Sequence, residues 1–382
     1  EMIPYGRHDI SEDDINAVVA VLKSEYLTQG PAVPAFERAV ADWCGAAHGV
    51  ALNSATSALH VACMALELGE GDWLWTVPTT FVASANCALY CGAQVDFVDI
   101  DPVHLTMCPK ALAEKLENAA TTGRLPKVIV PVHLCGQSAD MQAIGALASQ
   151  YGVHVIEDAS HAIGATYQGR PVGDCRFSDI CVFSFHPVKI ITTAEGGLAT
   201  TQNASLARAM QLARSHGITR EPAEMTQAPD GPWYYQQVSL GYNYRMTEMQ
   251  AALGLSQMSR LEPFILRRRE LAARYDRLLN GFPLTRPTAP ENTQSAWHLY
   301  VLRVAAARHK DVFQALRDDD IGVNLHYIPV HTQPYYRAMG FTLGQFPNAE
   351  TYYQEAISIP LHAGLTDAEQ DRVVESLRRA LA

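Results

Sequence analysis

The sequence predicts an α/β protein with a large domain built on a doubly wound, mixed or mostly parallel sheet, followed by a smaller α+β domain. Two observations support this fold class. Short apolar runs alternate with amphipathic segments up to about Gln250, a pattern typical of strands and helices in a parallel sheet. A long helical stretch and mixed elements then follow. With 382 residues, 48% of them hydrophobic, the chain is long enough to bury two cores.

The large domain is expected to span residues 1–255. Its first helix is predicted from Ser11 to Ser24, because Ser11 and Asp14 form a capping-box-like start. Apolar residues recur there at helical spacing, namely Ile15, Val18, Val19 and Leu22. Buried strands are predicted at Leu74–Val77, Gln94–Val98, Lys127–Pro131, Val153–Glu157 and Asp179–Ser184. Helices between them are predicted at Ser57–Leu68, Pro109–Ala119 and Asp140–Tyr151.

The small domain is expected to span residues 256–382. The helical stretch that leads into it, Glu248–Asn280, is predicted to break at Pro263, since proline interrupts a helix interior. A segment rich in Pro and Asn at 283–293, which is typical of a loop, then precedes the remaining elements. These are an apolar segment at Trp297–Val304, a helix at Lys310–Asp319, a strand at Gly322–His326 and a final helix at Asp367–Leu381.

Composition argues against several classes of protein. The formal net charge is −11, and the only tight basic run, Arg267–Arg269, is typical of a solvated helix face, so we expect no nucleic-acid partner. No apolar stretch has the 18 or so residues that a membrane span requires, and we expect no membrane association. The segment Glu1–Asp14 is acidic and polar, unlike a secretory signal, which favours a cytoplasmic location.

The eight cysteines are expected to be reduced and structural. None stands in a Cys-x-x-Cys pair, and no histidine cluster completes a zinc spacing, so we expect no metal site. Most lie among Ala, Leu and Val, where a thiol acts as a small apolar filler.

A single lysine follows one of the predicted strands in a turn rich in small residues. Ser184-Phe185-His186-Pro187-Val188-Lys189 leads into Thr192–Gly197, which contains a glycine pair. A buried ammonium group is costly, so Lys189 should be either exposed or chemically engaged. Desolvation would lower its pKa below the usual value of about 10.4 and favour the neutral, nucleophilic amine. The alternative is an ordinary surface lysine.

An acidic residue ends the strand that precedes this one in the predicted sheet. Asp158 follows Val153–Glu157, and carboxylates at the C-terminal ends of parallel strands point into the ligand crevice. Asp158 therefore suits the acidic partner that a pyridoxal-phosphate ring nitrogen requires. A helix N-cap is the alternative reading of Asp158. His161, three residues on, could face the phenolic oxygen of such a cofactor or could be structural.

Two further segments could complete a cofactor site. Asn53–Leu59 is a small polar turn that opens a helix, where free N–H groups and the helix dipole favour a phosphate; Ala55 and Thr56 lie in it. The same pattern also describes a plain N-cap. Phe81, after another strand, could stack on a pyridine ring or could be an ordinary core residue.

Together these motifs resemble the DegT/DnrJ/EryC1/StrS sugar aminotransferases, in the order that the family has them and over nearly the whole chain. The segments that carry the resemblance are Thr28–Gly30, Asn53–Leu59, Thr80–Phe81, Glu157–Asp158, Ser184–Lys189, Ala194–Gly197 and Gly241–Glu248. The resemblance implies fold type I of the pyridoxal-phosphate (PLP) enzymes and a homodimer with active sites at the subunit interface. Pyridoxal 5′-phosphate would be the cofactor, with pyridoxamine phosphate formed during turnover.

The resemblance also implies roles for individual residues. Lys189 matches the lysine that carries PLP as a Schiff base, and Asp158 matches the partner of the pyridinium nitrogen. Ser184 and the backbone around Ala55 and Thr56 match phosphate ligands. Asn243 matches an asparagine that reaches the phosphate bound by the neighbouring subunit. The positions that match contacts to the nucleotide-sugar are Tyr5, Tyr26, Leu27, Thr28, Gln29, His326 and Tyr327.

Within the family, the chain looks most like the pseudaminic-acid branch, partly because His161 replaces the glutamine of many relatives. That branch implies transfer of the amino group of L-glutamate to C4 of UDP-4-keto-6-deoxy-N-acetyl-β-L-altrosamine. Another nucleotide 4-ketosugar, such as UDP-4-ketoarabinose, remains an alternative. Two further alternatives are a PLP-dependent sugar dehydratase, in which histidine replaces the lysine, and a non-catalytic regulator with a PLP-enzyme fold.

Overall fold

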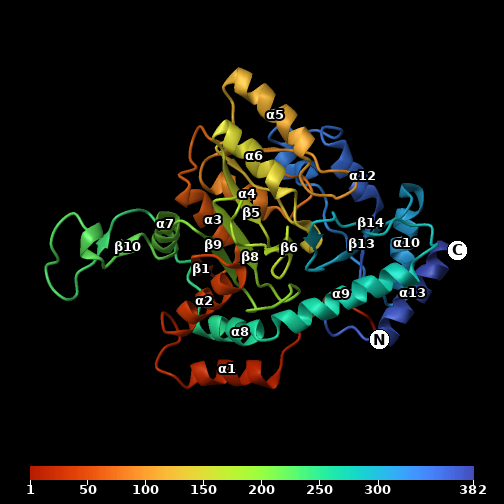
Figure 1. Ribbon diagram of the computed structural model, residues 1–382, viewed down its shortest axis with the longest axis horizontal. Helices are drawn as coiled ribbons and strands as arrows, with labels where there is room; N and C mark the ends of the chain where they lie inside the picture. The colour runs from red at the N-terminus through yellow and green to blue at the C-terminus, as the bar shows by residue number, and fades with distance from the viewer.

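The computed structural model describes residues 1–382 and is built around a seven-stranded sheet (Figure 1). The strands lie in the order β1-β9-β8-β5-β4-β2-β3. Their bounds are β1 His48–Leu52, β2 Trp73–Thr76, β3 Gln94–Phe97, β4 Val128–Ile129, β5 His154–Asp158, β8 Ile180–Ser184 and β9 Gly197–Thr201. Only β9 is antiparallel to its neighbours, so the other six strands share one direction and end at the same edge. The expected doubly wound, mixed sheet is confirmed.

Helices connect the strands and cover the sheet (Figure 1). They are α1 Glu12–Leu22, α2 Ala32–Cys44, α3 Ala55–Ala65, α4 Ala83–Tyr90, α5 Pro109–Thr122, α6 Met141–Tyr151 and α7 Ala204–Arg214. The expected capping box begins α1, where the Ser11 hydroxyl accepts from the Asp14 amide and the Asp14 carboxylate accepts from the Ser11 amide. Ser54 and Asp140 cap α3 and α6 with their side chains, which accept from the amides of Ser57 and Ala143.

The C-terminal part contains two long helices and a two-stranded sheet. Its elements are α8 Glu248–Met258, α9 Leu261–Leu278, β13 Tyr300–Arg303, α10 Ala306–Asp318, α11 Pro334–Arg337, α12 Pro347–Glu355, β14 Ala356–Ile359 and α13 Asp367–Leu381. The helical stretch breaks at Ser259–Arg260 and not at Pro263, which was expected. Pro263 lies in the first turn of α9, where a missing N–H costs nothing.

The prediction of a strand at Gly322–His326 is wrong, because no strand forms there. This segment makes only isolated bridges, from Asn324 to Ser358 and from neighbouring Ile321 to Ile3. The Asn324 amide donates to the Ser358 carbonyl, but no continuous ladder follows. The final helix at Asp367–Leu381 is confirmed. The expected division after residue 255 falls inside α8 and remains a prediction.

Three apolar clusters form the interior. Alternate residues of β8 serve two of them, because successive side chains of a strand point to opposite faces. Ile180 and Val182 join the cluster under α3–α6, whereas Cys181 and Phe183 join the cluster against α2, α8 and α9. The third cluster lies between α9, α10 and α13 and includes Ile3 from the other end of the chain. Each fully buried Ile or Phe stabilises the fold by roughly 1.5–3 kcal/mol.

An arm projects from the body between α7 and α8 (Figure 1, left). It contains the short strands β10 Ile218–Thr219 and β11 Gln236–Gln237 and the 3₁₀ turn η2 Pro222–Glu224. Trp233 on this arm is 71% exposed. The remaining short elements are the sheet β6 Thr166–Tyr167, β7 Arg170–Pro171 and β12 Thr293–Gln294, and the turns η1 Leu134–Gly136 and η3 Val330–Thr332.

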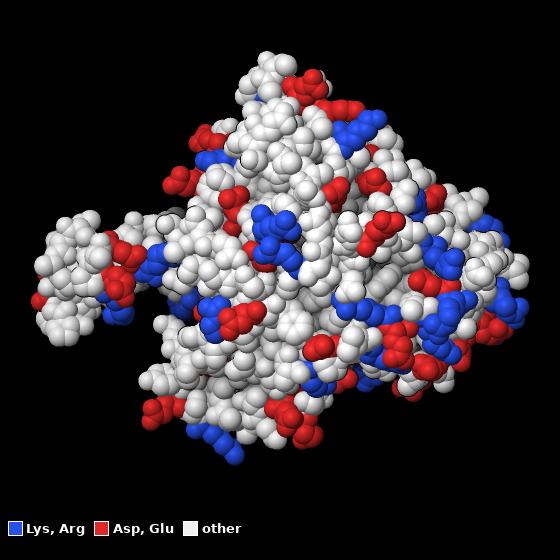
Figure 2. Space-filling view, in the orientation of Figure 1, with Lys and Arg blue, Asp and Glu red and all other residues white.

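Acidic and basic side chains are interspersed over the face drawn in Figure 2, in keeping with the absence of a basic patch in the sequence. None of the helices combines the length and the apolar character that a bilayer crossing needs. All eight cysteines are free thiols. No group of three or more metal-ligating side chains is present.

Candidate active site

A cavity of about 430 Å³ opens at the C-terminal edge of the parallel strands, the edge at which ligands bind in open α/β sheets. Its volume lies in the range typical of small-molecule sites. Ten of the residues expected to form the site line this cavity: Tyr5, Ala55, Thr56, Phe81, Asp158, His161, Ser184, Lys189, His326 and Tyr327. Residues distant in sequence therefore meet at one place, because β5 and β8 end there and the helix α3 begins there.

Lys189 lies in the turn after β8, where its amide donates to the carbonyl of His186. Burial lowers the pKa of the Lys189 ammonium group to about 8, although the charge of Asp158 opposes this shift. Near pH 8 about half of this amine, when free, is thus neutral and nucleophilic, a far larger share than for an unburied lysine. An ordinary surface lysine has neither this burial nor this cavity.

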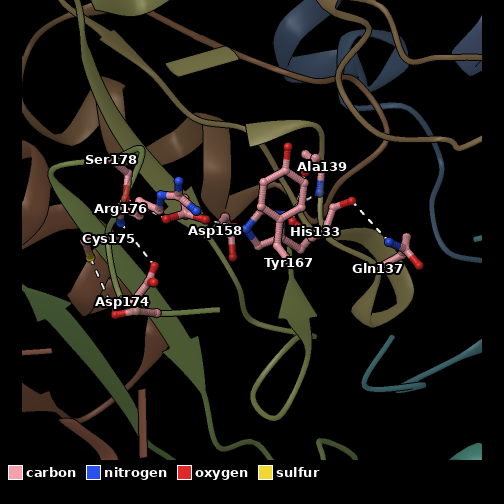
Figure 3. Close-up of polar contacts among 12 residues, drawn as sticks. His133, Gln137, Ala139, Asp158, Tyr167, Asp174, Cys175, Arg176 and Ser178 are labelled. Carbon is pink, nitrogen blue, oxygen red and sulfur yellow. Dashed lines mark hydrogen bonds and ion pairs between the residues drawn. The ribbon is translucent and has the colours of Figure 1, made fainter. Parts of the chain in front are cut away.

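Asp158 ends β5 and is buried at the cavity wall (Figure 3). Its two carboxylate oxygens accept separate hydrogen bonds, from the Ser84 hydroxyl at 2.6 Å and from the Ser160 hydroxyl at 2.6 Å. These bonds orient the carboxylate while leaving further lone pairs for a ligand. No helix begins directly after Asp158, so the N-cap alternative does not apply.

A second polar network holds the end of this strand, and Figure 3 labels His133, Ala139 and Ser178 in it. His133 lies 2.8 Å from the Glu157 carboxylate through Nε2 and accepts from the Ala139 amide through Nδ1. Ser178 donates to the other oxygen of Glu157 at 2.5 Å. Glu157 therefore braces the end of β5 on the face of the strand opposite to Asp158, which lines the cavity.

The N-terminus of α3 forms one end of the cavity. Ser54, Ala55 and Thr56 line it, and the positive end of the helix dipole favours an anion there. Gly197 lets β9 approach this turn, because a Cβ at Gly197 would lie 2.5 Å from the backbone of Ser54 and Ala55. The Ser184 hydroxyl lines the same region.

The opposite wall carries aromatic and histidine rings. Phe81 is 58% exposed and lines the cavity, so it is no core residue and its ring is free to stack. His161 is buried; its Nδ1 accepts from the Cys135 amide at 3.0 Å, and its Nε2 lies 2.8 Å from the Tyr327 hydroxyl. Burial lowers the pKa of His161 well below its usual range. Burial also lowers the pKa of His326, to about 4.

The remaining expected residues lie outside the cavity. Tyr26, Leu27, Thr28 and Gln29 are exposed in the segment between α1 and α2. Asn243 is exposed and bridges Ser215. Within one chain, none of these residues lines the cavity. The segment Gly241–Glu248 lies next to the site, because the Tyr244 carbonyl accepts from the Asn53 amide at 2.8 Å.

Three cavity residues were not expected from the sequence. Ser84 and Ser160 hold Asp158, and His298 is buried against His161 at a ring-centroid distance of 4.4 Å. Ser160 lies two residues after Asp158, and Ser84 lies about one helical turn after Thr80–Phe81. Closeness in sequence to these motifs was therefore the one signal that could have predicted both serines. His298 offered none, because it lies in an apolar stretch of the C-terminal part.

This arrangement fits pyridoxal phosphate. A helix N-terminus with small side chains suits a phosphate, a buried carboxylate suits a protonated ring nitrogen, and a lysine with a lowered pKa suits a Schiff base. The bound cofactor supplies the electron sink for amino-group transfer. A doubly wound sheet with this set of residues defines a PLP-dependent transferase of fold type I.

The comparisons with known proteins agree. The model of the DegT/DnrJ/EryC1/StrS aminotransferase family matches residues 8–378, and the chain belongs to this family. It is 40% identical to the spore coat polysaccharide biosynthesis protein SpsC of Bacillus subtilis, over 98% of this chain and 96% of SpsC. The enzyme is therefore a PLP-dependent sugar aminotransferase.

Solved structures of sugar aminotransferases are also similar. Helicobacter pylori PseC, an aminotransferase involved in the biosynthesis of pseudoaminic acid, has a TM-score of 0.92 at 31% identity, covering 100% of this chain and 99% of PseC. The putative sugar aminotransferase Spr1654 of Streptococcus pneumoniae, in its PMP form, has a TM-score of 0.91 at 30% identity, covering 99% and 98% of the two chains.

Proposed function

We propose that this aminotransferase moves the amino group of L-glutamate to C4 of a UDP-4-keto-6-deoxy-N-acetylhexosamine, as in pseudaminic acid biosynthesis. The observation that carries the proposal is the cavity that joins Lys189, Asp158 and the N-terminus of α3. Similarity to PseC supports the choice of sugar, and similarity to SpsC supports a role in polysaccharide formation.

The cavity residues would have separate roles in proton transfer and in binding the cofactor. Lys189 binds the cofactor and, once released, its neutral amine takes a proton from one carbon and returns it to another. Asp158, oriented by Ser84 and Ser160, holds the proton on the ring nitrogen. Phe81 would stack on the ring, while Ser184 and the amides around Ala55 and Thr56, which line the same cavity, would bind the phosphate.

We further propose that the enzyme works as a homodimer with shared sites. Asn243 and the segment Tyr26–Gln29 are exposed and lie outside their own cavity, which suits contacts to the cofactor phosphate and the nucleotide-sugar in a partner. On α1, three residues of the apolar stripe are exposed, namely Ile15, Val19 and Leu22. A second copy of the chain would cover such surfaces.

The dehydratase alternative loses support because Lys189 is present and lies in the cavity. A regulator without catalysis would have no use for a buried carboxylate that lines the same cavity as that lysine. Eight free thiols are in keeping with a reducing compartment, and we propose the cytoplasm as the location.

The choice of sugar is tested by comparing two acceptors. With L-glutamate held constant, kcat/KM for UDP-4-keto-6-deoxy-N-acetyl-altrosamine should exceed kcat/KM for UDP-4-ketoarabinose. The acetamido group should contribute more to this preference than the methyl group. An extra methyl group contributes only about 1–3 kcal/mol to discrimination between substrates. A polar group of the site that is left without its hydrogen-bond partner disfavours an analogue far more strongly. Equal or reversed values would remove the pseudaminic assignment and leave the aminotransferase standing.

A further inference from the structure

Tyr327 and His161 form a hydrogen-bonded pair whose proton positions follow from the geometry. A backbone N–H can only donate, so the 3.0 Å contact from the Cys135 amide requires an unprotonated Nδ1 on His161. The ring is neutral, since burial holds the pKa of His161 well below its usual range. The single ring proton therefore lies on Nε2.

The Tyr327 hydroxyl must then accept from His161. Nε2–H points to the Tyr327 oxygen at 2.8 Å, which uses one lone pair of that oxygen and leaves the phenolic hydrogen without a partner. No other hydrogen bond involves the Tyr327 hydroxyl, and the side chain lines the cavity with Lys189. Burial raises the pKa of Tyr327 well above its usual range, so the group keeps its proton. The result is a hydroxyl whose hydrogen has no partner within the protein and is free to donate into the cavity.

We propose that Tyr327 donates this proton to the carbonyl oxygen of the amino acceptor, and that His161 and the Cys135 amide position it. Both acceptors of the reaction, the ketosugar and the 2-oxo acid, carry such an oxygen at the reacting carbon. When an amino group adds to that carbon, a C–N bond forms and the C–O bond breaks. The oxygen leaves as water with the two protons of the amine.

Tyr327 supplies this oxygen with a proton and regains one from the adding nitrogen, so no net proton is consumed. His161 Nε2–H stabilises the charge that develops on the phenolic oxygen during the exchange. This assignment rests on the aminotransferase activity and on L-glutamate as the donor, and it makes Tyr327 a catalytic residue and His161 a positioning residue.

The first test is Tyr327→Phe, which removes one oxygen atom, with Tyr167→Phe as the matched control. Tyr167 also has a hydrogen-bonded hydroxyl, but it lines a different cavity. Enzyme loaded with pyridoxamine phosphate is mixed rapidly with 2-oxoglutarate, and the visible absorbance is followed. Loss of a general acid should slow the reaction by about 10²-fold in Tyr327→Phe. The rate of Tyr167→Phe should stay within about twofold of the wild-type rate. The Kd for pyridoxal phosphate should also stay within about twofold of the wild-type value in both variants.

An isotope effect separates catalysis from a structural role. With L-glutamate deuterated at C2, the wild-type reaction should be slower than with the protonated donor, because a C–H bond breaks. In Tyr327→Phe this ratio should fall towards one, since the steps at the carbonyl oxygen become limiting. A Tyr327→Phe variant that reacts at nearly the wild-type rate, or reacts slowly with an undiminished isotope effect, would overturn the inference.

Variants of His161 test the positioning role. In His161→Gln the amide oxygen can accept from Cys135 and the amide nitrogen can donate to Tyr327, so most of the rate should remain. His161→Leu should react slowly. In the double variant His161→Leu/Tyr327→Phe the rate should be no lower than in Tyr327→Phe alone. Equal rates for His161→Gln and His161→Leu would refute the positioning, even if Tyr327→Phe did not fold. Absence of any reaction of the wild type with L-glutamate would instead refute the proposed donor.

Discussion

Replacement of Lys189 by methionine should stabilise the protein when the cofactor has been removed. The protonated amine is disfavoured in the folded state, where burial lowers the pKa from its usual 10.5 to about 8. At about 1.4 kcal/mol per pKa unit, this lowering from 10.5 to about 8 amounts to a penalty of roughly 3–4 kcal/mol. Methionine has a similar length and carries no charge, so the variant lacks the penalty.

The difference should depend on pH in one direction only. Below pH 8 the lysine is protonated in both the folded and the unfolded state, and the full penalty applies. From pH 8 to 10.5 the unfolded state binds the extra proton, so the stability of the wild type rises with pH. Above 10.5 the penalty has gone.

The assay is urea unfolding of both cofactor-free proteins at pH 7.0 and pH 10.0, at equal protein concentration. The methionine variant should be more stable than the wild type by roughly 3–4 kcal/mol at pH 7.0, and this difference should narrow strongly at pH 10.0. Exposed Lys23 provides the control, since Lys23→Met should change stability by less than about 0.5 kcal/mol at either pH. A gap that is absent at pH 7.0, or equal at both pH values, would refute a buried, partly deprotonated Lys189.

Three other predictions concern the reaction and the assembly. Lys189→Ala should abolish turnover in a steady-state assay while the fold survives by circular dichroism, and a rate near wild type would show that another group does its work. Asp158→Asn should bind pyridoxal phosphate by absorbance yet lose about 10²-fold or more in kcat, since an amide cannot hold the ring proton by charge; full activity would contradict its role. Mixing inactive Lys189→Ala and Asn243→Ala subunits should restore activity, because one site of each mixed dimer is intact. No recovery after verified subunit exchange would mean that Asn243 acts within its own chain.

Much of the large domain could be predicted from the sequence because its strands are short apolar runs. β5 and β8 were expected within one or two residues. β9 was not, since Gly197–Thr201 is small and polar and becomes a strand only through its neighbours β1 and β8. The helix break at Ser259–Arg260 has no local breaker, whereas Pro263 fits a first turn without strain.

In the candidate site, too, residues with a local sequence signal could be predicted, and residues placed by tertiary packing could not. Lys189 and Asp158 stand directly at strand ends, where topology alone brings them together. Ser84 reaches Asp158 from 74 positions away, and the pairing of His161 with Tyr327 joins residues 166 positions apart. Such pairings depend on the packed tertiary structure, and no local pattern of residue types specifies them.

The pairing of Ile3 with Ile321 has a consequence for the order in which the protein is completed during synthesis. Ile3 is buried in the cluster between α9, α10 and α13, and Tyr5, two residues later, is a wall of the cavity. A ribosome releases residues 3–5 first but must translate beyond residue 321 before they can find their partners. The doubly wound sheet can form earlier from contacts nearer in sequence. A nascent chain therefore holds Lys189 and Asp158 in place well before it has a closed pocket.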